Sequence, residues 1–392
     1  MGVLFASTAH AQVAVRAKTV HTMAGAAIEN GVVLVRDGKI ERVGAASGIS
    51  VPSDYRVLEA EVVTPGLIDA HSVVGLAGYL NQPQDSDQLE TSAPIQPELR
   101  AIDAFNARER LVEWLRGLGV TTIHTGHAPG ALVSGQTMIV KTTGADTDES
   151  VVVPTAMIAA ALGSAALAED DKSPGTRAKA VALLRAELIK AQEYLAKRKD
   201  ADEPPERDLT LEVLGQVLQR ERPLLVTAQR ATDITAALRI AEEFDIRLVL
   251  DGAAEAYLVT DAIKAAGVPV ILHPTMARAS GDLENLSMET AATLRKASIP
   301  LALQAGYEGY VPKTRVVLFE AAVASANGLT REESLAAVTI DAARILGIDK
   351  RLGSLEAGKD ADLVLFDGDP LEYTSHVVGV LIDGQVVSSE PQ

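Results

Sequence analysis

Short, fully apolar runs alternate with helix-forming stretches between residues 64 and 346, and this alternation constrains the fold more than any other feature. Residues 223–227 and 247–250 are two such runs, with the helix-forming segment 234–244 between them. Strands without a polar face are buried on both sides, as in a parallel sheet covered by helices. About 280 residues of this alternation predict an α/β fold of the (β/α)8 TIM-barrel type. No GxGxxG motif opens any of the helices, which disfavours a nucleotide-binding fold.

Both ends of the chain carry signals for β-hairpins. Asp37-Gly38 lies between apolar runs near the start, and Asp383-Gly384 repeats the pattern near the end. Asp-Gly between apolar runs is a strong hairpin signal. Because a few strands at one end cannot bury a face alone, we predict that residues 13–63 and 347–388 form one small composite β-sandwich. The barrel then comprises residues 64–346.

The composition excludes several classes of function. The chain has 36 Lys and Arg against 53 Asp and Glu, a net charge of −17, and only 3% aromatic residues. An acidic surface repels phosphate backbones, so we expect no nucleic-acid partner. The chain has no cysteine, which rules out disulfides, thiolate metal sites and a cysteine nucleophile. No apolar run reaches the ~18 residues needed to span a membrane.

Residues 1–12 read MGVLFASTAHAQ and look like a processing segment. Ala9-His10-Ala11 has the small-x-small form of a signal-peptidase site, and the residues before it include a short apolar run. We interpret residues 1–12 as the remnant of a signal peptide, with a disordered leader as the alternative. The first interpretation predicts export to a bacterial periplasm, and the second a cytoplasmic protein.

Motifs at both ends of the barrel resemble a known family. Residues 63–71 read VTPGLIDAH, and residues 353–364 read GSLEAGKDADLV. The first is similar to the first barrel strand of the metal-dependent amidohydrolase superfamily, and the second resembles its closing segment. The layout of residues 230–274 is similar to the imidazolonepropionase-like branch. The resemblance implies a TIM-type barrel with a composite domain, and a hydrolase acting on non-peptide C–N bonds.

The same resemblance implies that most of the family's metal ligands are replaced. The family's first strand carries two histidines one residue apart, and here the pair is His71 and Val73. The ligand histidines of the fifth and sixth strands correspond to Thr227 and Gly252. The aspartate of the last strand, which binds metal and acts as general base, corresponds to Gly306. A catalytic zinc needs about three protein ligands, so we predict no metal cofactor unless the site is rebuilt from other residues.

Other polar residues are placed where barrel strands are expected to end, at the mouth where such barrels carry their active sites. The candidates for a rebuilt zinc site or for acid–base catalysis are His71, His124, His127, His273 and Asp251. Imidazole and carboxylate groups suit both roles. The alternative is that these histidines are satisfied structurally by hydrogen bonds to the loops.

Weaker candidates for substrate binding at the same rim are Gln229, Arg230 and Tyr307. Some amidohydrolases carbamylate a barrel lysine to bridge two metals. With the other ligands replaced, we predict that Lys141 is instead a surface or structural lysine.

Three functional hypotheses follow. The first is a degenerate amidohydrolase that no longer hydrolyses and acts as a paralogous partner subunit, as a homo-oligomer or as a binder of small molecules. The second is an active amide or cyclic-amide hydrolase with a reorganised site. The third is unrelated chemistry on the same barrel, because a fold does not decide a function.

Overall fold

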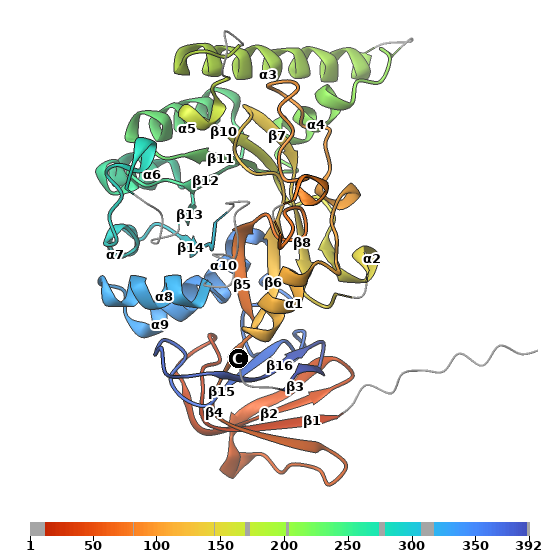
Figure 1. The fold of residues 1–392 in the computed structure, drawn as a ribbon, viewed down its shortest axis with the longest axis vertical. Helices are drawn as coiled ribbons and strands as arrows, with labels where there is room; N and C mark the ends of the chain where they lie inside the picture. Colours follow the sequence, from red (N-terminus) through yellow and green to blue (C-terminus); the bar gives the residue numbers. More distant parts are fainter. Residues whose placement is uncertain are drawn as a thin grey trace, which may run out of the picture.

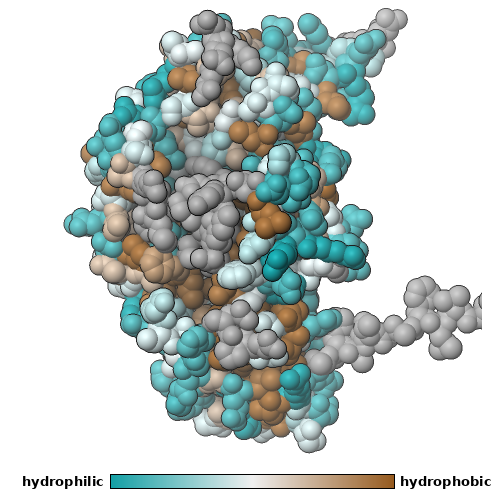
Figure 2. Space-filling model, viewed as in Figure 1, coloured by the Kyte–Doolittle hydropathy of each residue, from teal (hydrophilic) through white to brown (hydrophobic). Residues whose placement is uncertain are grey.

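The computed structural model shows two regions, a small sheet domain and a larger barrel-type domain (Figure 1). It describes residues 12–80, 82–144, 146–168, 173–200, 204–273, 279–306 and 317–389. The predicted leader, apart from Gln12, and Tyr307 lie outside the described residues. Figure 2 shows one face of the molecule as a mosaic of hydrophilic and hydrophobic groups. None of the described helices is long and apolar enough to cross a membrane.

The small domain is one seven-stranded sheet built from both ends of the chain. The strands lie in the order β17-β16-β15-β4-β1-β2-β3, so that β15 from the C-terminal end pairs with β4 from the N-terminal end. Their bounds are β1 (Val13–Val20), β2 (Ile28–Arg36), β3 (Lys39–Ala45), β4 (Arg56–Pro65), β15 (Leu363–Phe366), β16 (Val377–Ile382) and β17 (Gln385–Ser388).

This sheet curves so that its two halves enclose one core. Val33 and Val35 of β2 belong to the same buried cluster as Leu363 and Leu365 of β15. Irregular pairing within β2–β3 and β15–β16 allows the strands to bend. The halves of the predicted sandwich are therefore continuous through hydrogen bonds between β15 and β4, and are not two separate sheets.

The barrel-type domain is built from a six-stranded sheet and a four-stranded sheet. The first has the order β14-β13-β12-β11-β10-β7 and the second the order β5-β6-β8-β9. The sheets meet where Ser72 bridges Gly306, and where the backbone of Thr137 bonds that of Met157. The bounds are β5 (Leu67–Ser72), β6 (Val120–Thr125), β7 (Val133–Gln136), β8 (Met138–Lys141), β9 (Val151–Val153), β10 (Ile158–Ala161), β11 (Leu224–Ala228), β12 (Leu248–Gly252), β13 (Val270–Leu272) and β14 (Leu301–Leu303).

Helices follow most of the parallel strands, as the alternation predicted. The α-helices are α1 (Arg110–Gly117), α2 (Thr147–Ser150), α3 (Arg177–Asp200), α4 (Leu209–Leu218), α5 (Ala231–Phe244), α6 (Thr260–Ala266), α7 (Thr290–Lys296), α8 (Val317–Ala326), α9 (Arg331–Ala337) and α10 (Ile340–Leu346). The short 3-10 helices are η1 (Ala46–Gly48), η2 (Pro83–Asp85), η3 (Ala101–Asp103), η4 (Ser164–Ala166), η5 (Ala256–Leu258) and η6 (Gly281–Leu283).

The expectation of uniformly parallel barrel strands is wrong at β8, which pairs with β6 in the antiparallel sense. Parallel neighbours need a crossover of about a dozen residues or more, usually a helix. Residues 126–137, between β6 and β8, contain β7 and no helix. The chain therefore returns along β6 instead of crossing over, and β8 runs from the mouth of the barrel towards its base.

An apolar layer fills the interior of the barrel. One buried cluster contains the inward-facing side chains of strands in both sheets, which explains why these strands read as apolar. Its strand members are Ile68, Ala70, Ile139, Leu225, Val249, Ile271 and Ala302. This layer fixes which residues near the strand ends face inward, because side chains two residues apart lie on the same face of a strand.

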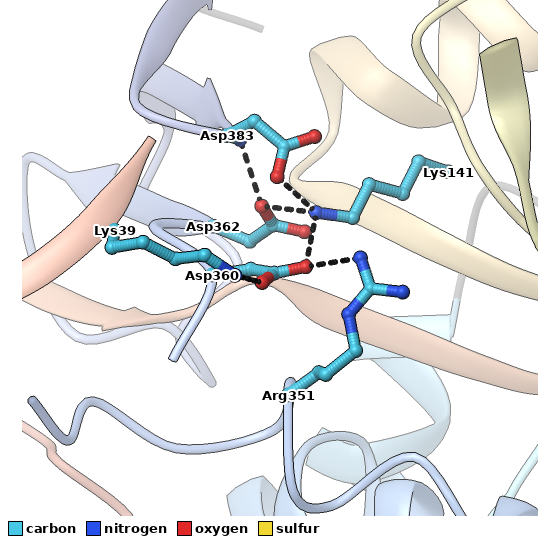
Figure 3. A network of polar contacts seen from close by, with 6 residues as sticks. All are labelled: Lys39, Lys141, Arg351, Asp360, Asp362 and Asp383. Carbon is cyan, nitrogen blue, oxygen red and sulfur yellow. Dashed lines mark hydrogen bonds and ion pairs between the residues drawn. The ribbon is translucent and has the colours of Figure 1, made fainter. Parts of the chain in front are cut away.

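Lys141, at the base of the barrel, joins the two domains. Its Nζ lies 3.0 Å from carboxylate oxygens of Asp360 and Asp362, and 2.6 Å from Asp383 (Figure 3). Arg351 and Lys39 also contact Asp360. Lys141 is thus a buried structural lysine at the end of β8 opposite the mouth.

The charges of this junction influence one another. Burial would lower the pKa of Lys141, but the carboxylates of Asp362, Asp383 and Asp360 outweigh burial and raise it. Burial raises the pKa of Asp362 to about 6 despite the opposing effect of Lys141. Burial also acts on Asp360, but Lys39, Lys141 and Arg351 hold its pKa at about 2.

Candidate functional site

A ring of polar side chains lies one layer above the apolar interior, at the mouth of the barrel. Thr227, Asp251, His273 and Gln304 each follow an inward-facing apolar residue by two positions on β11, β12, β13 and β14 or directly beyond them. Strand alternation therefore points all four into the barrel. Each is at most 4% exposed.

Asp251 is the centre of this ring. Its Oδ1 accepts hydrogen bonds from His71 Nδ1 at 2.9 Å and from Gln304 Nε2 at 2.8 Å. Its Oδ2 accepts a hydrogen bond from Thr227 Oγ1 at 2.6 Å. Three side chains, from β5, β11 and the end of β14, thus converge on one buried carboxylate of β12.

The hydrogen bonds keep Asp251 ionised. Burial alone would raise the pKa of this carboxyl group, but His71, Thr227 and Gln304 outweigh burial and lower it. A carboxylate that accepts several hydrogen bonds holds its charge even when buried. The buried negative charge of Asp251 is therefore stabilised by hydrogen-bond donors of the chain itself.

His124, on β6, is the second histidine near His71, with the ring centroids 5.4 Å apart. Its Nδ1 lies 2.7 Å from the carbonyl oxygen of Ala70, and its Nε2 lies 2.7 Å from Thr137 Oγ1. Burial, followed by the nearby His71, lowers the pKa of His124 to about 3. The imidazole is therefore neutral, with Nδ1–H donating to Ala70 and the Nε2 lone pair accepting from Thr137.

The end of β12 has a backbone that suits only glycine. Gly252 has φ +76°, in the left-handed region that side chains rarely adopt. A Cβ atom there would lie 2.3 Å from Nε2 of Gln229. The Gln229 side chain thus occupies the space that a residue at position 252 would need, and it also accepts a hydrogen bond from the backbone of Ala254.

Two further candidates from the sequence are His127 and Arg230. His127 is buried, and burial lowers its pKa. Arg230 lies at the start of α5 and pairs with Asp282 and Glu284, so its guanidinium is already held by carboxylates of the chain.

Asp69 closes the barrel beside this site. Its Oδ1 accepts hydrogen bonds from the backbone of Ala305 at 3.1 Å and of His71 at 3.4 Å. Burial raises the pKa of Asp69 to about 7. These contacts give Asp69 a structural role, tying β5 to the end of β14.

The residues of the mouth do not fit a catalytic zinc site. A zinc ion needs about three nitrogen, sulfur or carboxylate donors with lone pairs directed at one point. His124 uses both ring nitrogens within the chain, and both oxygens of Asp251 accept hydrogen bonds. Across the described parts of the chain, no three His, Asp or Glu side chains converge closely enough to hold a metal ion.

Sequence reasoning did not single out Thr137, but it placed Thr227, as a replaced ligand, at the barrel mouth near His71. Both belong to the hydrogen-bonded network of the mouth. The alternation along β11 explains that placement, because Thr227 lies two residues after the inward-facing Leu225. The antiparallel turn that brings Thr137 to His124 has no comparable signal in the sequence.

Comparisons with known proteins agree with this architecture. The sequence model of the amidohydrolase family matches residues 227–388. The crystal structure of an amidohydrolase from Thermotoga maritima MSB8 superimposes with a TM-score of 0.91 and 31% identity, covering 96% of this chain and all of that one.

Curated relatives are more distant in sequence. An imidazolonepropionase from Solibacter usitatus is 26% identical over 381 residues, covering 90% of this chain and 88% of that protein. The amidohydrolase tasK from Hapsidospora irregularis is 26% identical over 400 residues, covering 92% of this chain. The chain spans only 40% of the length of tasK.

Proposed function

We propose that this chain, which belongs to the amidohydrolase superfamily and to its imidazolonepropionase-like branch, has lost the hydrolytic reaction of that superfamily. It serves as a non-catalytic paralogue or partner subunit that keeps the barrel and its mouth. The observation that carries this proposal is the hydrogen bonding of Asp251, whose two oxygens accept three side-chain donors at 2.6–2.9 Å.

The chemical reason is that the polar groups at the mouth bond to one another and do not offer metal ligands. A hydrolytic zinc ion lowers the pKa of a bound water and polarises the carbonyl under attack. At this mouth, Thr227 and Gln304 contribute a hydroxyl and an amide, and both donate to Asp251 instead of offering an anionic or imidazole ligand. At Gly252, the left-handed backbone would strain any side chain, and a ligand there would also have to displace the Gln229 side chain.

The non-catalytic role predicts particular partners. The mouth retains polar groups suited to a small molecule, and the chain is expected to assemble with an active amidohydrolase paralogue or with itself. The proposal includes no nucleic-acid partner, because the net charge of −17 opposes phosphate binding. Export to a bacterial periplasm remains part of the proposal.

A second candidate is an amide or cyclic-amide hydrolase with a reorganised site, and one contact favours it. His71 Nδ1 lies 2.9 Å from Asp251 Oδ1. A carboxylate on one ring nitrogen orients an imidazole to act as a general base through the other. Under this alternative, His71 would be the catalytic residue and Asp251 its positioning residue.

The test measures metal content and hydrolysis on the same purified protein. Zinc, manganese and iron are quantified by mass spectrometry, and turnover is assayed with the imidazolone substrate, other cyclic amides and acyl amino acids. The Solibacter imidazolonepropionase serves as the positive control for the assay. We expect well under one metal ion per chain and no turnover above background.

Two results would contradict the proposal. Stoichiometric metal together with turnover would show a working metal hydrolase. Turnover without metal, reduced about 100-fold or more in His71→Ala, would instead support the general-base alternative.

A further inference from the structure

Residues 281–285, between β13 and α7, are tied to the loop that follows β10. The backbone N–H of Ser164 donates to Asp282 Oδ2 at 2.8 Å. Arg177, the first residue of α3, donates from Nη2 to Asp282 Oδ1 at 3.0 Å. Its Nε donates to Asp233 Oδ1 at 2.9 Å, which fixes the guanidinium in place.

The same segment is also tied to the loops that follow β11 and β12. Arg230 contacts Glu284, and its Nε lies 3.4 Å from Asp282. Asn285 Nδ2 donates to Glu255 Oε1 at 2.7 Å, and Tyr257 donates to the carbonyl oxygen of Asn285 at 3.0 Å. Together, these contacts tie residues 281–285 to the loops that follow three other strands, β10, β11 and β12.

Because these loops follow neighbouring strands, the contacts cross-link the strand ends along the rim of the barrel. Strands β10, β11, β12 and β13 are consecutive neighbours in one sheet, and their loops lie at the mouth. Residues 281–285, bonded beside β10, β11 and β12, therefore link the loops that follow three neighbouring strands. His71, Asp251 and Thr227 are no more than 4% exposed, so a molecule that is to reach them needs part of the surrounding chain to move.

The cross-link is suited to reversible opening. The side chains of Arg177, Arg230 and Glu284 are 41%, 35% and 54% exposed. Ion pairs with this exposure contribute little individually and are weakened by salt. Several such pairs can hold a segment in place and still let it open on a short timescale.

We propose that residues 281–285 form a strap that controls access to the polar ring, held closed by Arg177 and Arg230. Arg230 is then a residue of the gate and not a direct contact of a bound molecule in the closed state. The strap concerns the site of the proposed function but does not depend on it, because access can be measured without any hydrolysis.

The experiment labels histidines with diethyl pyrocarbonate, which acylates accessible neutral imidazoles, and reads each site by peptide mass spectrometry. The variants are Arg230→Gln, Arg177→Gln with Arg230→Gln, and Arg185→Gln as the matched control. Arg185 also lies on α3, but it pairs with Glu243 of α5 instead of with the strap. If circular dichroism shows that the double variant is unfolded, the single variant Arg230→Gln is compared with the wild type instead.

We expect labelling of His71 and His273 to be about fivefold faster or more in the strap variants. The wild-type protein should show the same trend when salt is raised from 50 mM to about 1 M. Arg185→Gln should match the wild type. Equal labelling rates in all proteins, or the same increase in Arg185→Gln, would overturn the proposal.

Discussion

The mouth and the base of the barrel both hold buried carboxylates, but they satisfy them in different ways. At the mouth, Asp251 accepts hydrogen bonds from two neutral side chains and one imidazole. At the base, three aspartates surround the ammonium group of Lys141 (Figure 3). The mouth distributes one charge over several donors, whereas at the base one buried cation contacts three carboxylates, and the more exposed Arg351 and Lys39 add to it at Asp360.

This difference predicts how each region responds to substitution. A hydrogen-bonded carboxylate loses a fraction of its support when one donor is removed. A charge cluster built on one buried cation loses its balance entirely when that cation is removed, because the remaining like charges repel in a poorly hydrated environment. The base should therefore be the more sensitive region.

The largest effect is expected for Lys141→Met. This substitution keeps the length of the side chain but leaves Asp360, Asp362 and Asp383 without their shared cation, and it should cost about 3–5 kcal/mol of unfolding free energy. Urea denaturation measures the change. Lys39→Met is the control, because the Lys39 side chain is half exposed and, of the three aspartates, pairs with Asp360, and its cost should be about 1 kcal/mol or less. Similar losses in both variants would refute the central role of Lys141.

A smaller loss is expected at the mouth for Asp251→Asn. The amide keeps the shape but removes the charge and turns one acceptor into a donor facing His71, Gln304 or Thr227, at a cost of about 2–3 kcal/mol. Asp245→Asn is the control, since Asp245 is 88% exposed and its partner Arg220 is also accessible. If the two variants unfold at the same urea concentration as the wild type, the hydrogen-bonded ring does not contribute as described.

The smallest effect is the contribution of Asp362, at the base, to the pH dependence of stability. The pKa of Asp362 is raised to about 6 in the folded protein, so folding favours its protonated form. Its stabilising contribution is complete below the unfolded value near 4 and is lost as pH rises through about 6. Unfolding free energy should therefore fall by on the order of 1 kcal/mol between pH 5 and pH 7.5.

Two variants separate the regions in this pH experiment. Asp69, whose pKa burial raises to about 7, also titrates in this range. Asp362→Asn cannot titrate and should reduce the slope between pH 5 and pH 7.5. Asp251→Asn should keep it, because the pKa of Asp251 is lowered and its titration lies at more acid pH. A slope of unchanged size in Asp362→Asn would assign the whole pH response to other groups, such as Asp69.

The sequence predicted the fold well where a local pattern determines the structure. The apolar run at 247–250 became β12, and the Asp-Gly pairs at 37–38 and 383–384 became turns between paired strands. The direction of β8 could not be read from its residues, because an alternating strand looks the same in either sense. The direction follows from residues 126–137, which hold no helix to cross over.

The site was predictable only as a set of candidates. Strand alternation places Asp251 and His273 on the inward face, but it cannot show that Asp251 accepts from His71, which lies 180 residues earlier. Nor could the sequence show that Arg230 is paired with Asp282 and Glu284. Such contacts depend on how loops from different strands approach one another, and no local pattern encodes that approach.

The most direct test of the account is a crystal structure from crystals grown with excess zinc, with anomalous data collected at the zinc absorption edge. The account predicts no anomalous peak at the mouth and an intact contact between His71 Nδ1 and Asp251 Oδ1, now 2.9 Å. A full-occupancy zinc peak at about 2.0–2.2 Å from His71 and Asp251, with the hydrogen bonds to Asp251 broken, would contradict it.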